Sequence, residues 1–371
     1  MSKLLHCAVF VSVLTVSLPI QAQNSFSNAY SQYTQAVEDK DYASAVKYAE
    51  VAYKFGQKKY QNSPKNLLNI KHNLALAYSQ NKQAIDAFAL MKEVTAQNVQ
   101  LYGEGSKEVF FARIDALSAL RSMEFEQIGK RKIAIKNLID DTADTAQSLA
   151  EASPREAAGL YYILASQINT GHVVNIFFKR AKKAAEIAEN ALLETAGNND
   201  TRTIEMQFKL GQFNGALKKR EAAVKYFETV VSTIKSEMEA SHPYELASHA
   251  NLVKLYEDMG ESDKATQHCV AIGQLTPWKD DIDQIPLHRV QPKYPVDYAK
   301  RRKNGSVIMS FDIDDYGFVK NPEVLDASGG SLFVKEAKRA LLKWRYAPKV
   351  ENGKAIYSEG HKVQLDFKIG A

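Results

Sequence analysis

The sequence predicts a multidomain chain in which an all-α superhelical solenoid precedes a small α+β domain, a three-stranded antiparallel sheet with helices on one face. Three observations predict this. Alanines recur at a fixed spacing in the first 275 residues, two segments near the C-terminus alternate between apolar and polar side chains, and a stretch with two prolines separates these patterns. A chain of 371 residues is long enough to bury more than one core.

The first 22 residues are typical of a secretory signal peptide. Lys3 precedes a 15-residue apolar run from Leu4 to Leu18, and a small-residue site follows at Ala22. A helix of this length spans about 22 Å, short of the roughly 30 Å of a bilayer core. We therefore expect residues 1–22 to be cleaved and the chain to be periplasmic. The alternative is an uncleaved segment that anchors the chain on the periplasmic side of the inner membrane.

Four segments within residues 24–275 share one helical skeleton. In each, a position on a first helix is followed 12 residues later by an alanine, where two helices would cross closely. Self-similarity at a fixed period indicates a solenoid, and the interval between the two pairs leaves room for about three more periods. We expect about six helical hairpins, with degenerate ones at 119–140 and 161–193. The alanines form two pairs, each 42 residues apart: Ala45 and Ala87, and Ala223 and Ala265.

This pattern resembles a longer, 42-residue variety of the tetratricopeptide repeat (TPR). The resemblance implies hairpins that bury their core between neighbours and present a concave groove to a protein partner. The sequence does not identify the side chains that line such a groove or the ligand that it binds. Cys269 falls at a packing position of the last repeat, so we expect a buried thiol, and loss of Cys7 with the signal peptide would leave no intrachain disulfide.

Residues 276–290 are the predicted linker, because Pro277 and Pro286 interrupt the helical pattern there. The terminal domain is expected over residues 285–371. Two of its segments alternate with period two, as half-buried antiparallel strands do. The inward side chains are Val307, Met309, Phe311 and Ile313 in one strand, and Val363, Leu365, Phe367 and Ile369 in the other.

The elements between these strands follow from local signals. Residues 314–317 form a hairpin turn in which Gly317 is free to take a positive φ. Apolar side chains from Phe333 to Trp344 recur at helical spacing, and Pro295 suits the first turn of a short helix. The last strand precedes only Gly370 and Ala371, so it should lie at a sheet edge, which is an aggregation hazard unless something pairs with it.

The order of these motifs, from Gln291-Pro292-Lys293-Tyr294-Pro295 through Gly317 and Phe333 to Lys343-Trp344-Arg345-Tyr346-Ala347-Pro348, closely resembles the C-terminal domain of the TonB family. The resemblance implies that residues 361–369 add a short receptor segment, the TonB box, as an extra strand. The implied partner-binding residues are Gln291, Pro292, Tyr294, Pro295, Lys362, Val363, Gln364, Leu365, Asp366, Phe367 and Lys368. The expected core residues are Phe311, Gly317, Phe333, Trp344, Tyr346 and Pro348. For Gln291, Tyr294 and Pro295 the alternative is that they only fix the entry to the first helix.

The function implied is that of a periplasmic TonB-family protein in TonB-dependent outer-membrane transport and energy transduction. Its partners would be TonB-dependent outer-membrane receptors or other TonB-system components, together with a protein partner in the TPR groove. A homodimer through the terminal edge strand is a further possibility. Two departures from the family put direct energy coupling in question. Ser2 and His6 have the spacing of the family's Ser-x-x-x-His membrane motif, but Ser2 lies outside the apolar run, and a Pro-rich spacer is missing. The alternatives are a periplasmic TPR scaffold with a non-transducing TonB-like module, or an anchored transducer.

Charge and motif content narrow the class of protein. Residues 285–371 hold 16 Lys and Arg against 10 Asp and Glu, so the basic surplus of the chain is local to the terminal domain. The surplus would attract acidic receptor segments, phospholipid head groups or peptidoglycan, or would simply be a solvated helix end. Nucleic acid is not an expected partner of an exported protein. We find no catalytic motif, metal-ligand pattern or phosphate-binding loop, and predict neither enzyme activity nor a cofactor.

Overall fold

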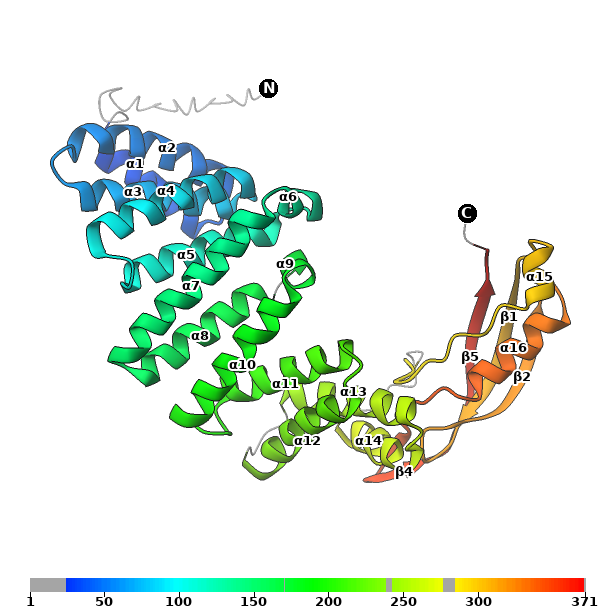
Figure 1. The fold of residues 1–371 in the computed structure, drawn as a ribbon. Helices are drawn as coiled ribbons and strands as arrows, with labels where there is room; N and C mark the ends of the chain where they lie inside the picture. Colours follow the sequence, from blue (N-terminus) through cyan, green and yellow to red (C-terminus); the bar gives the residue numbers. More distant parts are fainter. Residues whose placement is uncertain (1–24, 170, 238–241, 276–283, 370–371) are drawn as a thin grey trace, which may run out of the picture. The chain divides into compact units, whose positions relative to one another are not determined.

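The computed structural model describes residues 25–169, 171–237, 242–275 and 284–369, and the chain divides into two compact units, 1–181 and 182–371 (Figure 1). The border between the units falls within one helix, α10. The predicted signal peptide at 1–22 and most of the predicted linker, 276–283, lie outside the described residues. No helix in the described part of the chain has the length and apolar character that crossing a membrane requires.

The first unit consists of helices, and each early helix packs against the next one along the chain. Such nearest-neighbour packing is how a solenoid builds its core. The helices are α1 (Phe26–Glu38), α2 (Tyr42–Lys59), α3 (Pro64–Gln80), α4 (Ala84–Tyr102), α5 (Lys107–Ala119), α6 (Phe125–Lys130), α7 (Lys132–Ala152), α8 (Pro154–Ile168) and α9 (Gly171–Ile176). Helix α10 (Phe178–Thr195) begins in this unit, and most of it belongs to the second.

The repeated alanines lie where the sequence pattern puts them. Ala45 on α2 and Ala87 on α4 are fully buried, as are Ala223 and Ala265 in the second unit. A methyl side chain lets two helix backbones approach closely, which a larger residue would prevent. Within the described residues α1 packs against α2, α3 against α4, α5 against α7, α11 against α12 and α13 against α14, and the predicted all-α solenoid is confirmed.

The predicted degenerate hairpin at 119–140 was placed wrongly. Helix α5 ends at Ala119, a 3₁₀ turn follows at Leu120–Ser122, and the short α6 precedes α7. Glu124 and Gln127 form a capping box, in which each side chain accepts a hydrogen bond from the other residue's backbone N–H, and this box starts α6. The partner of α5 is therefore α7, whereas the segment at 161–193 does contain most of α8 and α10.

The second unit continues with α11 (Thr201–Ala216), α12 (Arg220–Glu237), α13 (Pro243–Met259) and α14 (Ser262–Leu275). Two buried histidines join the last pair, because the Nδ1 atoms of His249 and His268 lie 2.8 Å apart. His268 Nε2 lies 3.2 Å from the carboxylate of Glu228, which also accepts a hydrogen bond from the Tyr256 hydroxyl. Cys269 is buried in a cluster with Val253 and Ile272, and burial raises the pKa of its thiol to about 12.

The terminal domain contains α15 (Val296–Lys300), β1 (Gly305–Ile313), β2 (Val319–Ala327), α16 (Ser331–Leu341), β3 (Lys349–Glu351), β4 (Lys354–Ile356) and β5 (Ser358–Phe367). Strands β2, β1 and β5 form an antiparallel sheet in that order, and β3 and β4 form a separate hairpin. Helices α15 and α16 lie on one face of the sheet (Figure 1). The predicted α+β fold and three-stranded sheet are confirmed.

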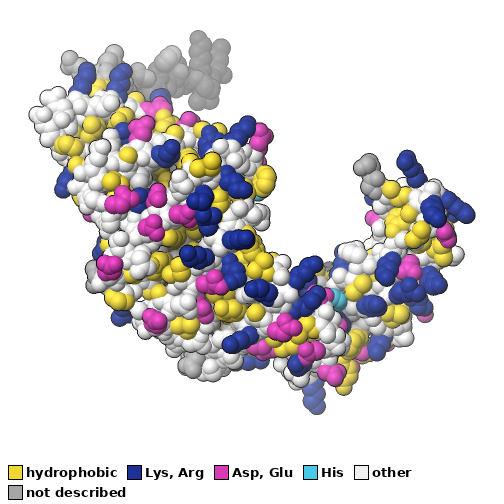
Figure 2. All heavy atoms as spheres, viewed as in Figure 1, with side chains coloured by type: hydrophobic (Ala, Val, Ile, Leu, Met, Phe, Trp, Pro, Cys, Tyr) yellow, Lys and Arg dark blue, Asp and Glu magenta, His cyan; other side chains and the backbone are white. Residues whose placement is uncertain are grey.

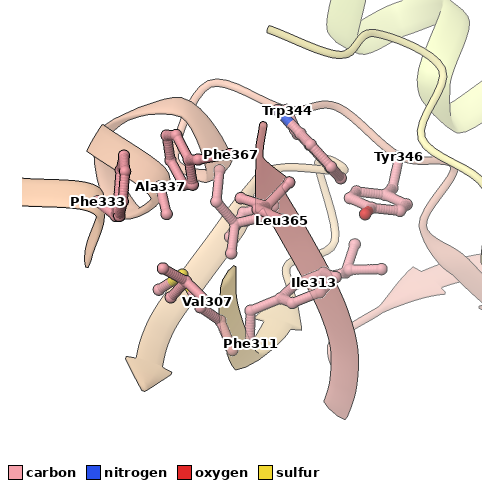
Figure 3. Packing of buried hydrophobic residues seen from close by; sticks show 12 residues of the cluster. Val307, Phe311, Ile313, Phe333, Ala337, Trp344, Tyr346, Leu365 and Phe367 are labelled. Atoms are coloured by element: carbon pink, nitrogen blue, oxygen red, sulfur yellow. The ribbon is translucent and has the colours of Figure 1, made fainter. Parts of the chain in front are cut away.

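The core of this domain lies between the sheet and α16. Figure 3 shows Phe333 and Ala337 of the helix facing Leu365 and Phe367 of β5 and Val307 and Phe311 of β1. The alternation of β1 is realised in full, since Val307, Met309, Phe311 and Ile313 are all buried. The alternation predicted for the last strand is wrong at its end, because β5 stops at Phe367 and Ile369 is 37% exposed.

The burial of His249 predicts that acid weakens the second unit. Burial first, and then the nearby His268, lower the pKa of His249 from 6.5 to about 4. The unfolded chain binds this proton below pH 6.5 and the folded chain does not until near pH 4, so the free energy of unfolding falls as the pH drops through this window. Between pH 7.5 and 5.0 the loss from this group is about 2 kcal/mol.

Urea-unfolding curves at the two pH values measure this loss. The variant His249→Asn should show a smaller difference between pH 7.5 and 5.0 than the wild type, and His172→Asn, at an exposed position, should show the same difference as the wild type. Equal pH sensitivity of all three proteins would mean that His249 is not the responsible group.

Candidate functional site

The outer edge of β5 is the candidate partner-binding site. β5 pairs along one side with β1, in a register that sets Val307 opposite Leu365 and Met309 opposite Val363. On its other side no strand of the described residues pairs with it. β5 is ten residues long, so it presents a row of backbone N–H and C=O groups that an extended segment could pair with.

The side chains of β5 separate into two sets. Leu365 and Phe367 are buried in the core and Val363 is half-buried against it. Lys362, Gln364 and Asp366 are exposed, and Gln364 donates a 2.8 Å hydrogen bond to the Asp366 carboxylate. Lys368 lies exposed just beyond the strand. The inward set holds the strand in place, and the outward set carries both charges and an amide.

Both ends of β5 are fixed by hydrogen bonds from other elements. At the start, the Asp312 carboxylate accepts hydrogen bonds from Gly360 N–H, the Tyr357 hydroxyl and the Asn321 amide. Burial acts to raise the pKa of Asp312, but these hydrogen bonds outweigh it and hold that pKa below its usual value. At the far end, Ile369 N–H donates to the Asn304 side chain over 3.1 Å. The edge is therefore held in its extended conformation.

The predicted segment 291–295 lies beside the end of β5. The ring of Tyr294 packs edge-on against Phe333 and Phe367, with centroids 5.4 and 6.0 Å away, and its hydroxyl donates to the Lys303 carbonyl. Pro295 is the N-cap residue of α15. Gln291 is exposed and Pro292 half-buried. The structure thus brings Tyr294 next to Phe367, and gives Tyr294 and Pro295 a role in fixing the chain at the entry to α15.

The residues expected in the core lie there. Phe311, Phe333, Trp344 and Tyr346 are buried, as is Pro348, and the Trp344 indole donates a 2.8 Å hydrogen bond to the Val290 carbonyl. Gly317 has φ +83°, and a Cβ at that position would collide with the Tyr346 carbonyl oxygen. Tyr346 N–H in turn donates to the Gly317 carbonyl over 2.9 Å. A side chain at position 317 would break this close approach of the two segments.

Arg345 was not singled out from the sequence, yet its buried side chain contacts two helices and the β1–β2 turn. Its side chain is 1% exposed and lies 3.7 Å from the ring centroid of Phe318. The guanidinium pairs with the Glu257 carboxylate on α13 and donates 2.8 Å to the Thr266 hydroxyl on α14 and 2.9 Å to the Tyr316 carbonyl. Arg345 therefore joins the last helical pair to the β1–β2 turn.

The backbone around Arg345 completes this junction. Arg345 N–H donates to the His288 carbonyl over 3.0 Å, and Leu287 N–H donates to the Arg345 carbonyl over 2.7 Å. Gly273 on α14 allows a further close approach, since a Cβ there would lie 2.6 Å from the Pro348 carbonyl oxygen. We call these contacts of Arg345 with Glu257, Thr266, Tyr316 and His288 the Arg345 clamp. The described end of the predicted linker is thus tied to the terminal domain.

No group of three or more His, Cys, Asp or Glu side chains in the described part of the chain is arranged to hold a metal ion. On β5 itself the charged side chains of Lys362 and Asp366 are exposed. What the arrangement around β5 offers is an extended backbone edge supported by a rigid core.

Together these features define a small α+β module that follows an array of helical hairpins. Residues 290–369 of this module match the family described as Gram-negative bacterial TonB protein C-terminal, so the predicted resemblance is confirmed for these residues. TonB of Escherichia coli is 39% identical over 83 residues, which are 22% of this chain and 32% of that protein. TonB of Pseudomonas aeruginosa is 32% identical over 90 residues, 24% of this chain and 26% of that protein. The match thus spans about a third or less of these relatives' own length.

Among solved structures, one likeness is to a TonB protein and another is to TPR-like repeats. The TonB2 protein of Vibrio anguillarum is 38% identical and aligns with a TM-score of 0.21, covering 26% of this chain and 91% of that one. The TPR-like repeats of a Podosopora anserina putative kinesin light chain are 19% identical and align with a TM-score of 0.43, covering 54% of this chain and 90% of that one.

The Arg345 clamp predicts a large loss of stability in the variant Arg345→Met. Methionine replaces the unbranched part of the side chain but removes the guanidinium, and so leaves the Glu257 carboxylate, only 13% exposed, without its ionic partner. Breaking a buried ion pair in this way costs about 3–5 kcal/mol. Urea unfolding followed by the fluorescence of Trp344, in a Trp278→Phe background, reports on the terminal domain directly.

The matched control is Lys343→Met, which removes an exposed cation two residues away and should change the free energy of unfolding by less than about 0.5 kcal/mol. The double variant Arg345→Met, Glu257→Gln should be more stable than the sum of the single losses, with a coupling of about 1–3 kcal/mol. Additive losses would show that the two side chains do not interact in solution.

Proposed function

We propose that this chain is a TonB-like adaptor of the Gram-negative cell envelope, exported to the periplasm, whose terminal domain grips extended segments of outer-membrane receptors or other TonB-system components. The observation that carries the proposal is the exposed ten-residue edge of β5 in a domain that matches the TonB C-terminal family. We propose no catalytic activity. Binding rests on the backbone and does not require reactive side chains.

Strand addition explains the two sets of side chains on β5. A docked segment would pair with backbone N–H and C=O groups of β5, so affinity would depend little on which residues it contains. Specificity would come from Lys362, Gln364 and Asp366 on β5 and from the exposed Gln291 beside it. Leu365 and Phe367 would act indirectly, by holding the edge in place. A second copy of the chain could occupy the same edge, and receptor segments would then compete with self-association.

We propose that the helical hairpins bind a second protein and so connect it to the receptor. The Arg345 clamp supports this division of roles, because it ties the last helical pair to the domain that carries β5. A partner held by the second unit would therefore keep a fixed position relative to the edge strand. Direct energy coupling would require an N-terminal membrane anchor. The proposed adaptor role requires neither that anchor nor direct coupling.

Titration of labelled TonB-box peptides against the full chain tests the proposal. Saturable binding is expected, and absence of binding at about 1 mM peptide, which corresponds to a free energy weaker than about −4 kcal/mol, would favour a scaffold whose terminal module does not bind receptors. Size-exclusion chromatography of the chain, with and without the peptide, shows whether the peptide dissociates a homodimer.

Proline substitution locates the binding edge. Neighbouring N–H groups of a strand point to opposite sides, so of Gln364→Pro and Leu365→Pro one removes a donor to β1 and the other removes an outward donor. The variant that stays folded by circular dichroism should bind peptide at least about tenfold more weakly, whereas Gln364→Ala should lose less than about 1 kcal/mol. Unchanged affinity in a folded proline variant would place the docking edge elsewhere, with β2 as the next strand to test.

A further inference from the structure

The helix layer of the terminal domain carries an unbalanced positive charge. Residues 291–303 and 331–343 together contain nine Lys and Arg but only two acidic residues, Asp297 and Glu336. Glu336 is paired with Arg339 over 3.0 Å. Figure 2 shows dark blue Lys and Arg side chains gathered over the region of α15 and α16. The surplus noted in the sequence is therefore confined to one layer of the domain.

The cations of α16 form a stripe on its outer face. Lys335, Lys338, Arg339 and Leu342 follow one another at helical spacing and are all exposed, while Phe333, Ala337 and Leu341 point into the core. A second set of exposed cations lies at the end of α15 and just after it: Lys300 is its last residue, and Arg301 and Arg302 follow. Two elements thus place their basic side chains on the layer that faces away from the sheet.

Apart from Arg339, which pairs with Glu336, these charges have no ion-pair partner among the described residues. Among the described residues, no carboxylate lies within ion-pair distance of Lys300, Arg301, Lys335 or Lys338, whereas many cations of the helical unit have such partners. Apolar side chains are exposed beside them, Val296 to 68% on α15 and Leu342 to 46% after α16. This face therefore presents both basic and apolar side chains that another surface could contact.

We propose that this helix layer binds the anionic head groups of a phospholipid membrane. A lipid surface carries its charge spread over a plane, which suits long Lys and Arg side chains distributed over two helices. Exposed apolar side chains among the cations suit the boundary between head groups and acyl chains, as in helices that lie on membrane surfaces. Charge complementarity and the position of Val296 thus favour a membrane over a soluble anionic protein.

The helix layer and the β5 edge are different surfaces of the domain. The cations lie on α15 and α16, which cover one face of the sheet, and the β5 backbone edge is not part of that layer (Figure 1). Membrane contact would therefore leave the edge strand accessible to a docked segment. The membrane proposal involves other residues than the proposed receptor binding, and either one can fail without the other.

Vesicle co-sedimentation of the full chain tests the proposal. We expect the chain to bind vesicles of phosphatidylcholine with about 30% phosphatidylglycerol more tightly than vesicles of phosphatidylcholine alone. Most of this difference should disappear in about 0.5 M NaCl, because salt screens exposed charges. The triple variant Lys335→Gln, Lys338→Gln, Arg339→Gln should bind the anionic vesicles roughly a hundredfold more weakly. The apolar N-terminal segment is common to all variants, so these differences report on the helix layer alone.

Two matched controls separate position from composition. Lys54→Gln, Lys92→Gln, Lys132→Gln makes the same change of net charge at exposed helical positions of the first unit and should retain most of the binding. Val296→Ser should weaken binding severalfold, whereas Ile133→Ser, at an even more exposed apolar residue, should not. Circular dichroism must show that all variants are folded.

Three outcomes would overturn the proposal. Equal binding to the neutral and anionic vesicles would show that head-group charge is not recognised. Equal losses in the two triple variants would show that net charge alone matters. Capture by isolated peptidoglycan without binding to anionic vesicles would assign the basic layer to a cell-wall polymer.

Discussion

The buried guanidinium of Arg345 is the interaction on which the arrangement of the second unit depends. One side chain pairs with α13, donates to α14, donates to the β1–β2 turn and stacks on Phe318, while its backbone pairs with residues 287 and 288. A buried cation is costly unless its charge is paired; here both terminal nitrogens of Arg345 donate hydrogen bonds, whereas its buried Nε–H has no hydrogen-bond partner in the described part of the chain. The partners of Arg345 lie 88 and 79 residues away along the chain in α13 and α14, so the clamp cannot form until helices and sheet are both folded.

A rigid support of this kind suits a domain that binds through an edge. The inner side of β5 is held by β1, by Leu365 and Phe367 in the core, and at its ends by Asp312 and Asn304. On the outer side no strand of the described residues pairs with its backbone groups. Because the strand is already extended, a docked segment would bear most of the ordering cost alone. The aromatic contact of Tyr294 with Phe367 extends the same support to the segment before α15.

Much of this could be predicted from the sequence because the signals are local. The alternation of Val307, Met309 and Phe311 reports a half-buried strand, and the 42-residue spacing of alanines reports helix crossings, without any knowledge of distant contacts. The pairing of α5 with α7 could not be predicted in this way, because a capping box at Glu124 inserts a short helix into the period. Arg345 was missed for a different reason. A charged residue is ordinarily expected to be exposed, even between Trp344 and Tyr346. Only the fold reveals Glu257 as the partner of Arg345. The one local signal was a cation flanked on both sides by buried aromatic residues.

The central claim is that β5 offers its outer backbone edge to an extended segment. Amide hydrogen exchange of the full chain, measured with and without a saturating TonB-box peptide, tests it most directly. In the free protein, alternate amides of residues 358–367 should exchange quickly, because their N–H groups point away from β1, and the peptide should protect that alternate set. The amides of β2 should be unaffected. Protection of β2 or of the helical hairpins, with no change along β5, would contradict the account.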